Sequence, residues 1–203
     1  MDASASAPAD DPRIGPNAIT RLAEALTADP AAGDPAPVFR RAGLAHALAA
    51  PPGDMVPQIE VISLYGALDA ALGTAAAARI AADAGRRTGA YLLAHRIPKP
   101  VQAVLRPLPA ALAGRVLLRA IQRNAWTFAG SGAVAIAAGR GRFRVTFTGA
   151  PTCAVPAIRA FYAGTFERLF RELVCGNCVA RPVAALDGDA WHFDIMPERG
   201  AAR

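Results

Sequence analysis

Residues 142–173 read RFRVTFTGAPTCAVPAIRAFYAGTFERLFREL, and the spacing of their apolar residues changes halfway. In Arg142–Thr148 polar and apolar residues alternate, which predicts a β-strand with one buried face. From Ile158 to Leu173 the large apolar residues recur at helical spacing, which predicts a long amphipathic helix. A strand and a helix that each carry one apolar face predict an α+β fold in which the helix packs on a sheet.

The alternating strand has partners before and after the helix. A segment of alternating apolar residues from Val134 and a Gly-Arg-Gly turn at 139–141 complete a first β-hairpin. Two further strands, about Val179–Leu186 and Ala190–Met196, flank an Asp-Gly-Asp turn at 187–189. We therefore expect an antiparallel sheet of about four strands, made of two hairpins with the long amphipathic helix between them.

The first half of the chain predicts helices. Residues 13–20 are expected to lead into a short helix that continues through about Leu26. Further helices are expected at about Val38–Ala49, 57–73, Ala75–His95, Val101–Leu105 and Ala110–Arg123. In the last of them Leu112, Val116, Leu117 and Ile121 are expected to face inward. We divide the chain into a disordered leader (1–12), an N-terminal helical extension (13–56), an α+β domain (57–197) and a tail (198–203).

Composition narrows the class of protein. The chain has 203 residues, of which 53% are hydrophobic, and no apolar run approaches the roughly 20 residues that span a bilayer. The first residues carry neither a basic nor an apolar signal region. Three cysteines are too few for a disulfide framework. We expect a cytoplasmic protein without a transmembrane segment.

Arginine carries nearly all the positive charge. The net charge is +6, and Lys99 is the only lysine. Arg115, Arg119 and Arg123 form an i,i+4 ladder, with Arg106 shortly before it. This ladder is either a solvated helix face or a patch for carboxylates or an acidic partner protein. Nucleic acid is not expected, because the chain has no basic tail and no zinc-finger spacing.

Four residues could bind zinc. Cys175 and Cys178 form a CxxC motif, with Cys153 upstream and His192 downstream. The alternative is a surface histidine beside partly buried thiols. A lone CxxC is a weak motif, so both interpretations stay open.

Two pairs of residues could bind a flat apolar ligand. Tyr91 and His95 lie one turn apart at the end of a predicted helix, where His95 either interacts with the helix dipole or ligates the metal of a tetrapyrrole. Trp126 and Phe128 precede a Gly-Ser-Gly segment, and they either pack in the core or stack on such a ligand.

Three segments resemble the 4-vinyl reductase family of bacteriochlorophyll biosynthesis, whose core is the four-vinyl-reductase domain. They are RIGPNAI at 13–19, RIP at 96–98 and AWTFAGSG at 125–132. The resemblance spans residues 13–196 and implies an α+β module at 57–197 that binds hydrophobic small molecules. The family name implies reduction of a vinyl group on a divinyl chlorophyllide. Some relatives bind zinc through a Cys-x8-Gly-Asp-x-x-Cys pattern, from which this chain departs because His192 stands at the position of the last cysteine.

The residues favour binding over reduction. Reduction needs a nicotinamide, flavin or iron–sulfur cofactor, and the chain has no dinucleotide fingerprint and too few cysteines for a four-cysteine cluster. We expect a protein that carries a Mg-porphyrin or chlorophyllide and presents it to pathway enzymes such as the Mg-chelatase or downstream enzymes. The alternatives are the reductase and a zinc-stabilised sensor of a hydrophobic ligand.

The expected site follows from the shape of a tetrapyrrole, a flat apolar disc with carboxylates on one edge. Its apolar walls are expected at Tyr91, His95, Trp126 and Phe128. The four arginines at 106, 115, 119 and 123 are expected to contact either the carboxylate edge or the acidic surface of a partner protein. The protein is expected in the cytoplasm, either free or bound peripherally to the photosynthetic membrane. A homodimer is one candidate assembly.

Overall fold

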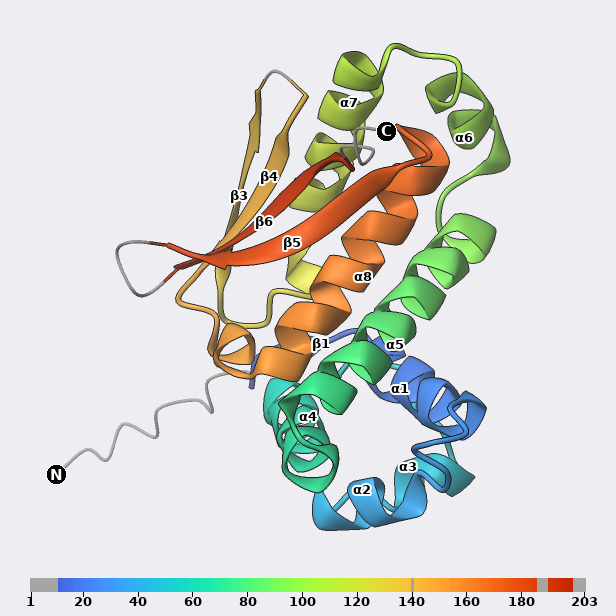
Figure 1. Ribbon diagram of the computed structural model, residues 1–203, viewed down its shortest axis with the longest axis vertical. Helices are drawn as coiled ribbons and strands as arrows, with labels where there is room; N and C mark the ends of the chain where they lie inside the picture. Colours follow the sequence, from blue (N-terminus) through green and yellow to red (C-terminus); the bar gives the residue numbers. More distant parts are fainter. Residues whose placement is uncertain (1–10, 140, 186–189, 199–203) are drawn as a thin grey trace, which may run out of the picture.

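The computed structural model describes residues 11–139, 141–185 and 190–198. It confirms an α+β fold in which a four-stranded sheet, α8 and α5 lie in successive layers (Figure 1). The α-helices are α1 Asn17–Ala28, α2 Ala36–Arg41, α3 His46–Ala49, α4 Gln58–Leu72, α5 Thr74–His95, α6 Lys99–Leu105, α7 Ala110–Arg123 and α8 Pro156–Leu173. The strands are β1 Arg13–Ile14, β2 Val56–Pro57, β3 Ala133–Ala138, β4 Phe143–Thr148, β5 Cys178–Ala184 and β6 Ala190–Pro197, and two 3-10 turns are η1 Ala125–Thr127 and η2 Pro151–Ala154.

The sheet has the strand order β3-β4-β6-β5, and each pair of neighbouring strands in it is antiparallel. The alternation in β4 places Phe143, Val145 and Phe147 on the buried face. Phe193 and Ile195 of β6 continue that face, and α8 covers it. The two predicted hairpins are therefore confirmed as strand pairs, while the turn at 187–189 lies outside the described residues.

Helices α5 and α8 cross at glycines. A Cβ atom on Gly85 would collide with the carbonyl group of Phe161, and one on Gly164 would collide with the carbonyl group of Ala82. The Thr165 hydroxyl donates a hydrogen bond to the Gly85 carbonyl at 3.1 Å across the same contact. The missing side chains let the two backbones approach closely.

Helix α7 differs from the prediction in its orientation. Leu117 and Ile121 are buried as predicted, but Leu112 and Val116 are 48% and 47% exposed. The ring of Phe143 occupies the space above Gly114, so the buried stripe of α7 centres on that glycine. The inward orientation predicted for Leu112 and Val116 is therefore wrong.

The helix predicted over Val38–Ala49 is also interrupted. It forms two short helices, α2 and α3, separated by Gly43, whose φ of 74° lies in the left-handed region. Such a backbone conformation ends a helix and is readily adopted by glycine.

The N-terminal segment shares the core of the rest of the chain. Ile19 and Leu22 of α1 belong to the same buried cluster as Ile80 of α5 and Phe147 of the sheet. The Tyr65 hydroxyl donates a hydrogen bond to the Ala18 carbonyl at 3.0 Å. Among the described residues, none of the helices is both long and apolar enough to cross a bilayer.

Candidate functional site

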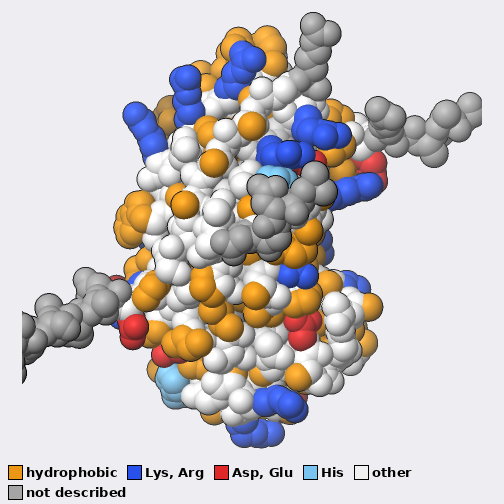
Figure 2. All heavy atoms as spheres, turned by 90° about the vertical axis from the view of Figure 1, so that its left-hand side faces the viewer, with side chains coloured by type: hydrophobic (Ala, Val, Ile, Leu, Met, Phe, Trp, Pro, Cys, Tyr) orange, Lys and Arg blue, Asp and Glu red, His pale blue; other side chains and the backbone are white. Residues whose placement is uncertain are grey.

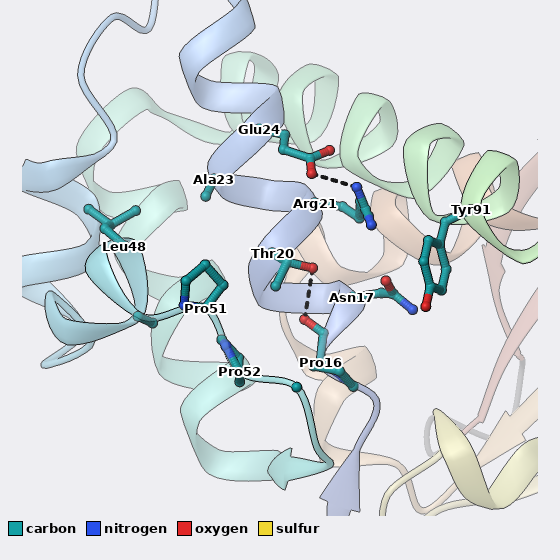
Figure 3. Close-up of a pocket in the computed structure, with 12 residues that line it drawn as sticks. Pro16, Asn17, Thr20, Arg21, Ala23, Glu24, Leu48, Pro51, Pro52 and Tyr91 are labelled. Carbon is teal, nitrogen blue, oxygen red and sulfur yellow. Dashed lines mark hydrogen bonds and ion pairs between the residues drawn. The ribbon is translucent and has the colours of Figure 1, made fainter. Parts of the chain in front are cut away.

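A hollow of about 380 Å³ opens between α1, the α3 region and α5 (Figure 3). Its walls are formed by Pro16, Asn17, Thr20, Arg21, Ala23, Glu24, Ala47, Leu48, Pro51, Pro52, Gly53 and Tyr91. Figure 3 shows Leu48, Pro51 and Pro52 on one side of α1, and Asn17 and Arg21 on the side of Tyr91. The hollow therefore combines an apolar wall with a polar one.

Arg21 is the cation of the hollow. Its Nη1 donates to Glu24 Oε1 at 2.5 Å, and its guanidinium carbon lies 4.8 Å from the centre of the Tyr91 ring. Its Nε is buried and has no hydrogen-bond partner among the described residues. A buried donor without a partner is costly, so a ligand oxygen at this nitrogen would be favoured.

Tyr91 and His95 lie together at the end of α5, as the sequence predicts. Their ring centres are 4.8 Å apart and their planes make an angle of 40°. Tyr91 contributes to the wall of the hollow, and His95, one turn further, is exposed. An exposed imidazole beside an aromatic ring can reach a ligand that extends out of the hollow.

The structure separates Trp126 from Phe128. Trp126 lies on η1 and is 68% exposed. Phe128 packs on Phe147 and Tyr162, and its carbonyl accepts a hydrogen bond from the Tyr162 hydroxyl at 2.7 Å. Phe128 is therefore packed against the core, whereas Trp126 has a ring face available to a ligand.

The turn that carries Trp126 is joined to the start of α1. The Gly15 N–H donates to the Thr127 carbonyl at 2.7 Å, and the next two residues, Pro16 and Asn17, line the hollow. The ribbon of this turn lies on the Tyr91 side in Figure 3. Trp126 is thus held near the hollow without being part of its wall.

The four predicted arginines lie outside the hollow. Arg106 pairs with Glu172 of α8 at 2.5 Å. Arg115, Arg119 and Arg123 are exposed on α7. Sequence reasoning instead missed Arg21 and Asn17. Asn17 belongs to the segment 13–19 that carries the resemblance, and Arg21 follows it by one helical turn.

The four predicted zinc ligands are not brought together. Cys175 and Cys178 form a disulfide, and burial raises the pKa of the Cys153 thiol to about 11. His192 lies on the outer face of the sheet, with its Nδ1 3.0 Å from the Thr146 hydroxyl. In the described part of the chain, no group of three or more His, Cys, Asp or Glu side chains has a geometry that could hold a metal.

The layer between the sheet and α8 is filled by aromatic rings. Phe147 stacks on Tyr162 with ring centres 4.9 Å apart, and Phe193 meets Phe166 edge to face at 5.5 Å. All four are buried, and burial raises the pKa of Tyr162 well above its ordinary value. This close packing makes the layer a core and not a ligand cavity.

Known proteins resemble the chain along most of its length. It is 36% identical over 201 residues to the bacteriochlorophyll synthase 23 kDa chain of Cereibacter sphaeroides, covering 94% of each protein. It is 37% identical over 205 residues to the protein of that name from Rhodobacter capsulatus, covering 98% of this chain and 94% of that one. No family model matches the chain.

Two solved H-NOX structures share the fold. An Fe(II) unliganded variant from K. algicida has a TM-score of 0.58 at 11% identity, covering 92% of this chain and 97% of that one. A second H-NOX structure has a TM-score of 0.55 at 10% identity, covering 94% and 98%. The curated relatives confirm the predicted resemblance to a bacteriochlorophyll-biosynthesis family, while the four-vinyl-reductase domain stays a prediction. The chain belongs to the family of the bacteriochlorophyll synthase 23 kDa chains.

Proposed function

We propose that this protein takes part in bacteriochlorophyll biosynthesis by binding a Mg-porphyrin or chlorophyllide intermediate at the hollow and presenting it to pathway enzymes. Membership of the family of bacteriochlorophyll synthase 23 kDa chains supports a role in this pathway. The observation that carries the binding site is the Nε of Arg21, which has no partner in the described part of the chain and belongs to a guanidinium beside the ring of Tyr91. A tetrapyrrole has the matching chemistry, because it is a flat apolar ring system with carboxylates on one edge.

Each part of the hollow has a role in this proposal. Arg21 and Asn17 would bind a carboxylate, since a guanidinium forms strong hydrogen bonds with this group. Leu48 and Pro51 would contact the apolar edge of the macrocycle. Tyr91 and His95 would lie along its exposed side, with His95 as the candidate ligand of the metal.

The size of the hollow suits presentation. Sites that enclose a whole drug-sized ligand span about 300–1,000 Å³, and this hollow is near the lower limit at about 380 Å³. It would hold the carboxylate-bearing edge and leave much of the disc accessible. Trp126, exposed nearby on η1, would supply a stacking surface for the remainder.

A resident heme in the interior does not fit this chain. One of the H-NOX structures that share the fold was studied for its heme distortion. Here aromatic side chains fill the layer between the sheet and α8. The three histidines, His46, His95 and His192, lie outside that layer. The ligand of this proposal is therefore cargo at the surface and not a buried prosthetic group.

Titration of the purified chain with Mg-protoporphyrin tests the proposal. We expect a saturable Soret shift that Arg21→Gln weakens about 10- to 100-fold, the range for a lost charge-assisted hydrogen bond. Trp126→Ala should weaken binding about 5- to 100-fold, by analogy with base stacking on aromatic platforms. Arg40→Gln on α2 is the matched control and should bind like the parent, and melting temperatures verify folding.

Two outcomes would contradict the proposal. One is an absence of saturable binding by the folded parent. The other is equal affinity of the parent and a folded Arg21→Gln variant, which would remove the hollow as the site. NADPH is added in a separate arm, where reduction of a divinyl substrate by this chain alone would favour the reductase over the carrier.

A further inference from the structure

Helices α6 and α7 expose an unusual set of apolar side chains. Val101 and Val104 of α6 and Leu112 and Val116 of α7 are each between 43% and 63% exposed. They account for most of the strongly exposed large hydrophobic side chains in the described residues. The buried stripe of α7 is complete without them, so folding does not explain them. Exposed apolar groups gathered on one surface indicate an interaction site.

Basic side chains surround these aliphatic groups. On α7, Leu112, Val116, Arg119 and Arg123 follow one another at spacings of four, three and four residues, which places them on one face, with Arg115 beside them. In Figure 2, blue basic and orange apolar side chains gather at the upper end of the molecule, where Figure 1 places α7 and the start of the loop that connects it to α6. We call this surface, formed by the exposed side chains of 99–123, the α6–α7 face.

Acidic residues are missing from a long part of the chain around this face. Residues 84–166 contain twelve Lys and Arg and no Asp or Glu, so they carry +12, and the rest of the chain carries −6. Arg106 is paired with Glu172. Lys99, Arg115, Arg119 and Arg123 form no ion pair with a carboxylate of the described residues, and their charges remain for an external anion.

We propose that the α6–α7 face docks the protein on an anionic lipid bilayer, with the aliphatic side chains entering the headgroup region and the cations binding lipid phosphates. Helices that lie in a membrane interface combine these two features. Long arginine side chains can extend to the phosphates while their stems lie along apolar surface. The face is a helical end of the molecule with branched aliphatic groups, and it offers no aromatic stacking surface on α6 or α7 of the kind used for nucleic-acid bases.

Vesicle sedimentation of the full chain, without any tetrapyrrole, tests this docking. The parent should bind phosphatidylcholine vesicles that contain about 30% phosphatidylglycerol and should not bind vesicles of phosphatidylcholine alone. Each basic residue near the surface contributes about a fivefold gain in partitioning. Arg115→Glu with Arg119→Glu should therefore weaken binding at least about 25-fold, and raised salt should weaken the parent.

Substitution of the aliphatic residues separates a bilayer from other polyanions. Leu112→Gln with Val116→Gln keeps every charge, and it should weaken vesicle binding at least about fivefold because the lost groups no longer enter the apolar boundary. Two controls lie elsewhere: Arg40→Glu with Arg41→Glu on α2, and Ile59→Gln at the strongly exposed Ile59 of α4. Both should bind vesicles like the parent.

Three results would overturn docking on a bilayer. The first is a folded parent that does not bind the anionic vesicles. The second is a loss in the controls that equals the loss in the α7 variants. The third is unchanged binding by the Leu112→Gln, Val116→Gln variant, which would point to a soluble acidic partner that binds through electrostatic attraction alone. Because no tetrapyrrole is present, each result is independent of the carrier proposal.

Discussion

Asp194 lies on the outer face of the sheet, where strand residues normally contact water, yet only 6% of its surface is exposed. Arg144 on the neighbouring strand donates two hydrogen bonds to the carboxylate, at 2.6 and 2.9 Å. The register pairs these two residues directly, and Arg181 of β5 stands opposite Asp194 on its other side. The guanidinium of Arg144 holds the pKa of Asp194 below its ordinary value.

This ion pair gives stability a defined pH dependence. A carboxylate with a lowered pKa stabilises the fold above its unfolded pKa of about 3.9, and the contribution is lost as pH falls through the lower folded value. We expect Asp194→Asn to reduce the free energy of unfolding by about 1–3 kcal/mol at neutral pH. The difference should shrink steadily below about pH 4 in urea unfolding. Asp54→Asn, at an exposed position, is the matched control.

His95 is the residue through which the carrier proposal can be tested by spectroscopy. It stacks on Tyr91 and is exposed at the end of α5. His95→Ala should shift the Soret band of bound Mg-porphyrin, because an imidazole ligand alters the absorption of the metal complex. Binding of metal-free porphyrin should be nearly unchanged. Identical spectra for the parent and the variant would exclude His95 as the ligand, and His46→Ala is the matched control.

At this scale the sequence predicted only part of the candidate site. Tyr91 and His95 are one helical turn apart, so their contact follows from helix geometry. Arg21 and Leu48 both line the hollow because α1 and α3 pack beside each other. Such packing of distant segments has no periodic signal in the sequence. The inward packing of Phe128, beside the exposed Trp126, likewise depends on a contact with the distant Phe147, which the sequence pattern does not reveal.

At the scale of elements, periodicity located the strands of the sheet and the long helices. It failed where a single residue decides the outcome. Gly43 divides the predicted helix of residues 38–49, and Gly114 accommodates a ring from β4 and thereby sets the rotation of α7. The Gly-Ser-Gly segment at 130–132 also has a structural explanation, because the Ser131 N–H donates to the side chain of the buried Gln58 at 2.8 Å.

The crossing of α5 and α8 should be the contact between helices most sensitive to added volume. Gly85→Ala and Gly164→Ala each place a methyl group against a backbone carbonyl, which cannot move aside as a side chain can. Each should lower the free energy of unfolding by about 1–3 kcal/mol, the usual cost of overpacking. Denaturant unfolding measures this change.

A third glycine in a helix provides the control for that contact. Gly66 of α4 has open space where its Cβ would lie. Gly66→Ala should therefore stabilise the protein by up to about 1 kcal/mol through helix propensity alone. If Gly85→Ala behaved like Gly66→Ala, the close approach of α5 and α8 would not hold in solution.

At the scale of the whole molecule, α5 connects the N-terminal helices to the sheet. It packs on α1 on one side and on α8 on the other. Strand β1 at residues 13–14 also pairs with β2 at residues 56–57. The buried cluster is continuous from Ile19 to Ile195. Buried residues on both sides of residue 56 belong to this cluster. The division at that residue stays a prediction, because composition does not report contacts.

A continuous core predicts a single cooperative unfolding transition, since neither part keeps its buried surface when the other unfolds. Trp126 and Trp191 report on η1 and the sheet, while far-ultraviolet circular dichroism reports mainly on the helices. The two signals should give the same urea midpoint. A chain that starts at Met55 should not fold cooperatively, because it would expose the surfaces of Tyr65 and Ile80 that α1 and its neighbours cover. Two separate midpoints would instead show that residues 13–56 fold as an independent extension.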